Sequence, residues 1–204
     1  MDFFFRGFVI GVSIAAPVGP IGLLCIQRTL THGRAVGFIS GLGAATADAL
    51  YGSVAGFGIG AIAHFLLAER VWIHLIGGLM LLGLGLRGLR RTPSETPREA
   101  APARSWGWSY GSILILTITN PMTVVSFMAI FAALGVANSA HVAATAGWTV
   151  AGVFSGSATW WFALSQAAGW LRNRFAPTHL VWVGRGSALV LMGFGVWATL
   201  SAWG

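Results

Sequence analysis

Charged side chains are scarce in this chain of 204 residues: they make up 8% of it, against roughly 25% in water-soluble domains. Lysine is absent altogether, so all twelve basic residues are arginines. Hydrophobic residues reach 56%, the mean hydropathy is +0.77, and long apolar runs are separated by short polar breaks. These runs are much longer than the ~10 residues of a membrane barrel strand. The composition therefore predicts one integral membrane domain of helices, spanning 1–204.

Cysteine is also nearly missing, since Cys25 is the only one. A single thiol excludes an internal disulfide and a thiol relay across the membrane. The chain lacks a Cys/His cluster suited to soft metals, and no histidine is expected at mid-membrane depth as a base for a nucleophile such as Ser155. We therefore expect no cofactor, no bound metal and no enzymatic activity. An intramembrane enzyme is the alternative from a different class.

The chain has a net charge of +7, and its arginines lie almost wholly in the polar breaks, which indicates membrane orientation and not a nucleic-acid-binding face. We expect six helices, at about 3–30, 35–66, 71–90, 107–134, 141–170 and 178–203. The segments after the first, third and fifth helices hold nine arginines, whereas the opposite side holds only Arg6 and Arg70. Because basic loops stay in the cytoplasm, both termini are expected outside it.

The two halves of the chain resemble each other. At a constant offset of 110 positions, Trp72 matches Trp182, Leu81 matches Leu191, and Gly85 matches Gly195. Chance similarity between apolar segments is the alternative. Each half has three helices, an odd number, so the halves must be inverted relative to each other, as in many secondary transporters. The expected fold is an all-α integral membrane bundle of two inverted three-helix repeats, at about 3–90 and 107–203, joined by a cytoplasmic linker at 91–106.

Helix-breaking residues lie inside one apolar run of each half. Pro17, Gly19 and Pro20 interrupt the first helix, and Asn120 and Pro121 interrupt the fourth. Proline frees backbone carbonyls, which survive at membrane depth only where protein or a water-filled cavity satisfies them. A half-helix N-terminus favours an anion and unwound carbonyls favour a cation, so two facing breaks would suit a zwitterion. The alternative is that the prolines only kink their helices for packing.

Asp48 is the only acidic residue deep inside an expected helix. An intramembrane carboxylate costs about 2.5 kcal/mol or more, which makes it a functional candidate by default. It shares a helix face with Gly52 and Gly56, where neighbouring helices approach closely, so we expect it on the wall of the cavity between the breaks. There it would bind a substrate ammonium or carry a coupled proton. A structural carboxyl, hydrogen-bonded within its helix or to another, is the alternative.

The Ala-Ala-Pro-Val-Gly-Pro segment ending at Pro20, the segment 41–48, Asn120-Pro121 and the glycine-punctuated third and sixth helices together resemble the lysine exporter (LysE/RhtB) family over the whole chain. Members are bacterial inner-membrane exporters, mostly of amino acids, and some relatives handle metal cations. The resemblance implies efflux driven by the proton motive force. It nominates as substrate-binding residues Pro17, Gly19, Pro20, Asp48, Asn120 and Pro121. The chain departs from common family patterns at Val18, within the first proline motif, and at Met122, where lysine is frequent.

The sequence therefore predicts a multi-pass secondary transporter of the bacterial plasma membrane. It would export amino acids or related small zwitterionic or cationic solutes. Export of a metal cation is the alternative within the same superfamily. The expected partners are a small-molecule substrate and the lipid bilayer, without nucleic acid, and a homodimer is compatible with the sequence.

Overall fold

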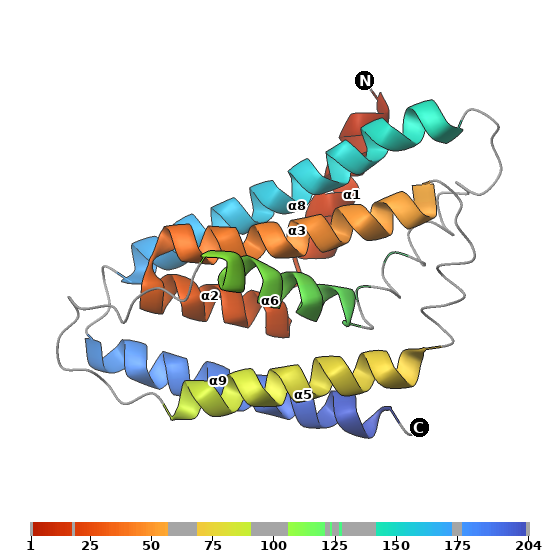
Figure 1. The fold of residues 1–204 in the computed structure, drawn as a ribbon. Helices are drawn as coiled ribbons and strands as arrows, with labels where there is room; N and C mark the ends of the chain where they lie inside the picture. Colours follow the sequence, from red (N-terminus) through yellow and green to blue (C-terminus); the bar gives the residue numbers. More distant parts are fainter. Residues whose placement is uncertain are drawn as a thin grey trace.

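The structure, a computed structural model, describes residues 2–17, 19–56, 69–90, 106–120, 123, 127, 142–172 and 177–202. Within these ranges there are seven helices and no strand (Figure 1). The helices are α1 (Asp2–Ala15), α2 (Pro20–His32), α3 (Arg34–Gly56), α5 (Arg70–Leu89), α6 (Trp106–Ile118), α8 (Val142–Arg172) and α9 (Pro177–Leu200). The all-helical prediction is confirmed for this part of the chain.

Helix boundaries agree with the apolar runs wherever both ends are described. The helices expected at about 71–90, 141–170 and 178–203 correspond to α5, α8 and α9 within a few residues. The run at 3–30, which was expected as a first helix interrupted at Pro17, Gly19 and Pro20, contains two helices, α1 and α2, bent 81° apart. Helices α3 and α6 begin as expected, and most of the remainder of their predicted ranges lies outside the described residues.

By length and apolar composition, α5 alone is able to cross a membrane, through its stretch Val71–Leu89. Helices α1 and α2 pass the same criterion when they are taken together as one bent pair. These findings concern the described part of the chain only. The number of spans and the relation between the two halves stay predictions.

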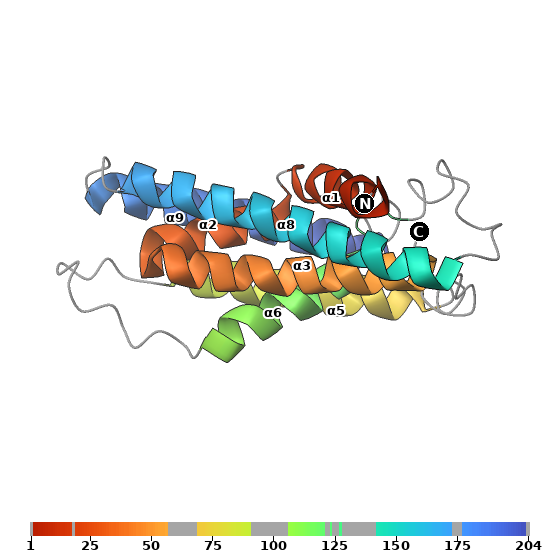
Figure 2. The same ribbon diagram turned by 90° about the horizontal axis from the view of Figure 1, so that it is seen from above.

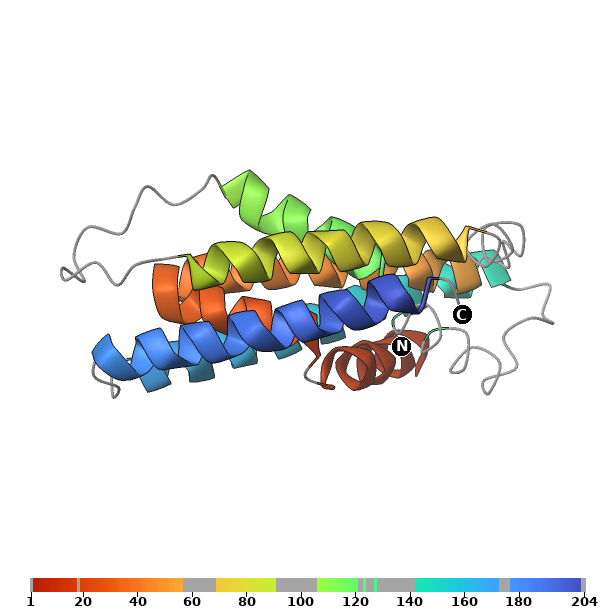
Figure 3. The same cartoon turned by 90° about the horizontal axis from the view of Figure 1, so that it is seen from below.

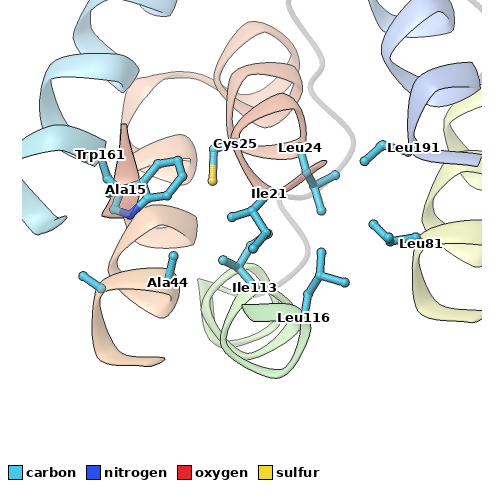
Figure 4. Packing of buried hydrophobic residues seen from close by; sticks show 11 residues of the cluster. Ala15, Ile21, Leu24, Cys25, Ala44, Leu81, Ile113, Leu116, Trp161 and Leu191 are labelled. Carbon is cyan, nitrogen blue, oxygen red and sulfur yellow. The ribbon is translucent and has the colours of Figure 1, made fainter. Parts of the chain in front are cut away.

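The helices form layers around a central pair. Helices α2 and α6 lie between the packed pair α3/α8 and the packed pair α5/α9 (Figure 1). Helix α1 packs against α8 (Figure 2), and α5 and α9 run side by side along another face (Figure 3). Leu81 of α5 and Leu191 of α9 point from that pair toward Leu24 and Leu116 of the central helices (Figure 4). This buried cluster joins the central helices to α5 and α9.

Glycines set the distance between α1 and α8. A Cβ added at Gly11 would lie 2.2 Å from the carbonyl oxygen of Val153, and one at Gly156 would lie 2.1 Å from that of Phe8. Neither helix could therefore carry a larger residue at its contact point without moving away from the other. Small residues at four-residue spacing are a common way for membrane helices to approach this closely. This close contact holds α1 against α8 and so sets the position in the bundle of the C-terminal end of α1.

The contact between α5 and α9 is reciprocal. A Cβ at Gly85 would lie 2.8 Å from the carbonyl oxygen of Ala188, and a Cβ at Gly195 would lie 2.9 Å from that of Gly78. Gly195 and Ala188 lie 110 positions after Gly85 and Gly78, which is the offset at which the two segments match in sequence. Exchanging the two helices therefore converts each of these close contacts into the other. This exchange is the pattern that a two-fold relation between equivalent helices produces.

The reciprocal contact predicts matched effects of alanine substitution. Gly85→Ala and Gly195→Ala should each destabilise the protein by about 1–3 kcal/mol, because the new methyl overlaps backbone of the facing helix. Gly83→Ala and Gly193→Ala are the controls, since no described atom lies within 4 Å of a Cβ at either position. These controls should be neutral or slightly stabilising, because alanine favours helix. Thermal unfolding of the purified variants measures the difference, and equal stability of all four would contradict the packing described here.

Candidate functional site

A cavity of about 340 Å³ opens where the described ends of α1, α2 and α6 meet α5 and α9. Its volume lies at the lower end of the range of small-molecule sites, about 300–1,000 Å³. Both halves of the chain contribute to its walls. The residues that line it are Ile14, Pro17, Gly19, Pro20, Ile21, His74, Gly77, Gly78, Leu81, Leu116, Thr119, Asn120, Thr123, Phe194, Trp197 and Ala198.

Four of the six predicted site residues come together in this cavity: Pro17, Gly19, Pro20 and Asn120. They come from segments about 100 residues apart in the sequence, one in each half. Pro121 lies outside the described residues. Asp48 is described, but it is not among the residues that line the cavity.

The N-terminus of α2 forms one wall. Gly19 is the N-cap residue, Pro20 is the first helical residue, and the Leu23 N–H donates to the Gly19 carbonyl at 3.0 Å. Amide groups ahead of this first helical bond have no acceptor inside the helix, and proline has no amide hydrogen to offer. Helix N-termini also carry partial positive charge. This wall therefore favours a negatively charged group.

The C-terminus of α6 forms a second wall of opposite character. The helix ends at Ile118, and a tight turn follows in which the Asn120 N–H donates to the Thr117 carbonyl at 3.2 Å. The Asn120 carbonyl accepts in turn from the Thr123 N–H at 3.1 Å. Helix C-terminal carbonyls carry partial negative charge, and the Asn120 side chain has both an acceptor oxygen and a donor amide. This wall favours a positively charged group.

Asp48 lies in a buried polar cluster between α3 and α8. Its carboxylate accepts a hydrogen bond from the Ser157 hydroxyl at 2.7 Å, and the Trp161 Nε1–H donates to the same hydroxyl oxygen at 3.1 Å. Asp48 is 3% exposed and Ser157 is fully buried. Ser157 is the partner on another helix that the structural alternative for Asp48 required. The carboxylate is nonetheless uncompensated by any ion pair with a described residue, which is unusual for a buried charge.

A hydrogen bond connects the helix of Asp48 to the cavity region. Tyr51 lies three residues after Asp48, on the same face of α3. Its hydroxyl donates to the carbonyl oxygen of Ile118, the last residue of α6. Ile118 is followed directly by Thr119 and Asn120, which line the cavity. The helix that carries Asp48 is therefore connected to the cavity wall through the Tyr51 side chain and the end of α6.

The sequence interpretation did not single out two residues, one in the cavity lining and one buried elsewhere in the bundle. His74 was not proposed as a site residue, and the structure places it in the cavity lining, one helical turn before Gly77 and Gly78. Arg28 was counted with the loop arginines, but it is buried and donates to the Ser40 hydroxyl at 3.0 Å, the Ser109 carbonyl at 2.7 Å and the Ser112 hydroxyl at 2.8 Å. Serines within otherwise apolar runs were the available signal, because a buried guanidinium needs such acceptors.

A cavity between helix ends inside a helical bundle is a common feature of membrane proteins that translocate solutes. The chain belongs to the LysE family: the model of the LysE type translocator matches residues 12–201. It is 29% identical over 138 residues to a Bacillus subtilis (strain 168) protein named "Putative amino acid efflux protein YcgF". It is 31% identical over 146 residues to the Escherichia coli (strain K12) "Uncharacterized membrane protein YahN".

These alignments cover 66% and 70% of the chain, which spans 64% of the length of each relative. No solved structure matches the chain. The family membership makes the chain a membrane protein of a translocator family. What it carries, and in which direction, must be argued from the site.

Proposed function

We propose that this protein exports amino acids, or related small zwitterionic or cationic solutes, from the cytoplasm of a bacterium. The observation that carries the proposal is the cavity between the N-terminus of α2 and the C-terminus of α6. An α-amino acid carries a negative carboxylate and a positive ammonium group on the same carbon atom. The two helix ends present the complementary partial charges on two walls of one small cavity. The name of the Bacillus subtilis relative agrees with this class of substrate.

In this proposal the two broken segments have distinct roles. The first-turn amides of α2 bind the substrate carboxylate, and Gly19 leaves that wall without a side chain. The carbonyls at the end of α6 and the Asn120 side chain bind the ammonium group, and Pro121 stays a predicted member of the same site. Pro17 and Pro20 keep the first break open because neither can donate to a helical hydrogen bond.

We further propose that the halves are inverted repeats within one domain. Two observations support this proposal. Helix α1 packs against α8 just as α6 packs against α3, so each half supplies the same pair of partners to the other. The reciprocal glycine contacts between α5 and α9 obey the offset at which the two halves match. Such repeats place the substrate site at their interface, near the membrane midplane.

The arrangement of helix ends supports a topology with both termini outside the cytoplasm. The bundle end where α2 meets α3 also contains the ends of α5 and α8 and the start of α6 (Figure 1). Four described arginines lie at these helix ends, namely Arg34, Arg87, Arg90 and Arg172, whereas Arg70 starts α5 at the opposite end. Positive charge marks the cytoplasmic side. A reporter enzyme that works only in the cytoplasm should therefore be active when it is fused within 91–106. Activity of a reporter that works only in the periplasm would reverse the topology.

Transport by the purified protein tests the proposed function. Reconstituted into vesicles, the protein should exchange internal for external radiolabelled amino acid, and an imposed proton gradient should drive accumulation against the concentration gradient. Empty vesicles give the background. Divalent metal ions assayed in parallel test the alternative cargo. Movement of metal ions without movement of any amino acid would overturn the proposal.

A further inference from the structure

The cavity walls differ sharply in polarity. Three polar side chains of the lining, Thr119, Asn120 and Thr123, follow the end of α6, and a fourth, His74, lies on α5. The remaining walls are built mainly from apolar side chains or glycines of α1, α2, α5 and α9. Five bulky apolar residues lie there: Ile14, Ile21, Leu81, Phe194 and Trp197. A solute in this cavity therefore meets polar groups on one side and hydrocarbon on the other.

Among the described residues that line the cavity there is no aspartate, glutamate or arginine, and the chain contains no lysine. Asp48, the acidic residue predicted to take part in transport, accepts a hydrogen bond from Ser157 between α3 and α8 and does not line the cavity. A charged substrate side chain would thus be brought against the apolar walls without a carboxylate or guanidinium to pair with it.

The energetic consequence of this lining depends on the substrate side chain. A charge at membrane depth without a partner costs about 2.5–3.5 kcal/mol or more. An apolar side chain placed in the same volume gains instead, by about 0.8 kcal/mol for each buried methylene. The two terms have opposite signs, so the cavity discriminates strongly between side chains of similar length that differ only in charge.

Resting on the proposed function, we infer that the substrates are amino acids with an uncharged, apolar side chain of intermediate size, such as leucine or norleucine, and not basic or acidic amino acids. The zwitterionic head is held between the ends of α2 and α6, as described above. The side chain extends toward Leu81, Phe194 and Trp197. The cavity of about 340 Å³ accommodates one such molecule.

Lysine and norleucine provide a matched pair of probes, because norleucine is lysine with the terminal ammonium group replaced by a hydrogen atom. Binding is measured by the thermal unfolding midpoint of the purified full chain over a concentration series of each. Norleucine and leucine should raise the midpoint, and lysine should bind on the order of 100-fold more weakly than norleucine, which is the fold-change that corresponds to the cost of the unpaired charge. Glutamate should be similarly weak, and glycine weaker than leucine.

Two variants at one position test whether wall polarity sets this preference. Phe194→Asp places a carboxylate on the apolar wall and should reverse the preference toward lysine, whereas Phe194→Asn adds polarity without charge and should not. The wild-type comparison stands even if a variant fails to fold. Lysine binding as tightly as norleucine would overturn the inference and leave amino-acid export intact. If no amino acid of any class binds or is transported, the inference falls together with the proposed function.

Discussion

Asp48→Asn is expected to abolish amino-acid export while the helical bundle stays assembled. Asparagine has nearly the same shape as aspartate, and its side-chain oxygen can still accept the hydrogen bond that Ser157 donates at 2.7 Å. What the substitution removes is the negative charge and the ability to bind and release a proton. Asp48 is 3% exposed and lies inside the bundle, so an amide at this position could fulfil any structural role of the carboxylate. The ability to bind and release a proton therefore has no structural purpose.

The position of Asp48 favours the proton-coupling role over direct binding of the substrate ammonium. It does not line the cavity, but Tyr51 and the end of α6 connect its helix to the cavity wall. Protonation of Asp48 can therefore alter the packing of α3 against α8 and α6 without contact with the substrate. The expected result is that the Asp48→Asn protein binds substrate with unchanged affinity but fails to accumulate it when a proton gradient is imposed.

Export by the Asp48→Asn variant is measured in vesicles, with substrate-dependent thermal stabilisation as the separate readout of binding. Ser157→Ala is the companion variant, since it keeps the carboxyl and removes its hydrogen-bond donor. It should destabilise the protein by about 1–3 kcal/mol, because Asp48 and the Trp161 indole both lose a buried partner. Near-normal export by Asp48→Asn would show that the carboxyl is structural, and lost binding would move it into the substrate site.

Some of the residues that line the cavity could be predicted because their signal is local. Pro17, Pro20 and Asn120 stand out in apolar runs, and the backbone consequences of proline do not depend on tertiary contacts. The helix boundaries could be predicted for the same reason, since polar breaks end apolar runs. Two facing breaks then require only that the two halves pack against each other.

Other parts of the site depend on contacts that no local pattern encodes. Asp48 meets Ser157, a residue 109 positions away, and many other hydroxyls in the chain could have served as that partner. Arg28 lies one turn before a helix end, where arginines are usually exposed, and only its packing against Ser40 and Ser112 shows that it is buried. The offset between the halves predicted that Gly85 and Gly195 are equivalent, but not that each packs against the other's helix.

The Gly19→Leu substitution tests whether the break at Pro17, Gly19 and Pro20 serves transport or only kinks the chain. Gly19 has φ −102° and ψ −160°, an extended conformation that any residue can adopt. No described atom lies within 4 Å of a Cβ built there, so the larger side chain meets no steric barrier among the described residues. Leucine is a poorer N-cap residue than glycine, which costs α2 about 1 kcal/mol at most. The fold should therefore tolerate Gly19→Leu.

Transport should not tolerate it. Gly19 lines the cavity, so the leucine side chain would occupy space between the end of α2 and the substrate and would cover the amides proposed to hold the carboxylate. We expect export to fall to the level of empty vesicles, and Gly19→Ala to retain part of the wild-type rate because its methyl group is smaller. Gly111→Leu is the matched control, since it adds the same side chain at another open glycine, on α6 and away from the cavity lining. If Gly19→Leu exports at the wild-type rate, substrate does not pass through this cavity and the prolines serve packing alone.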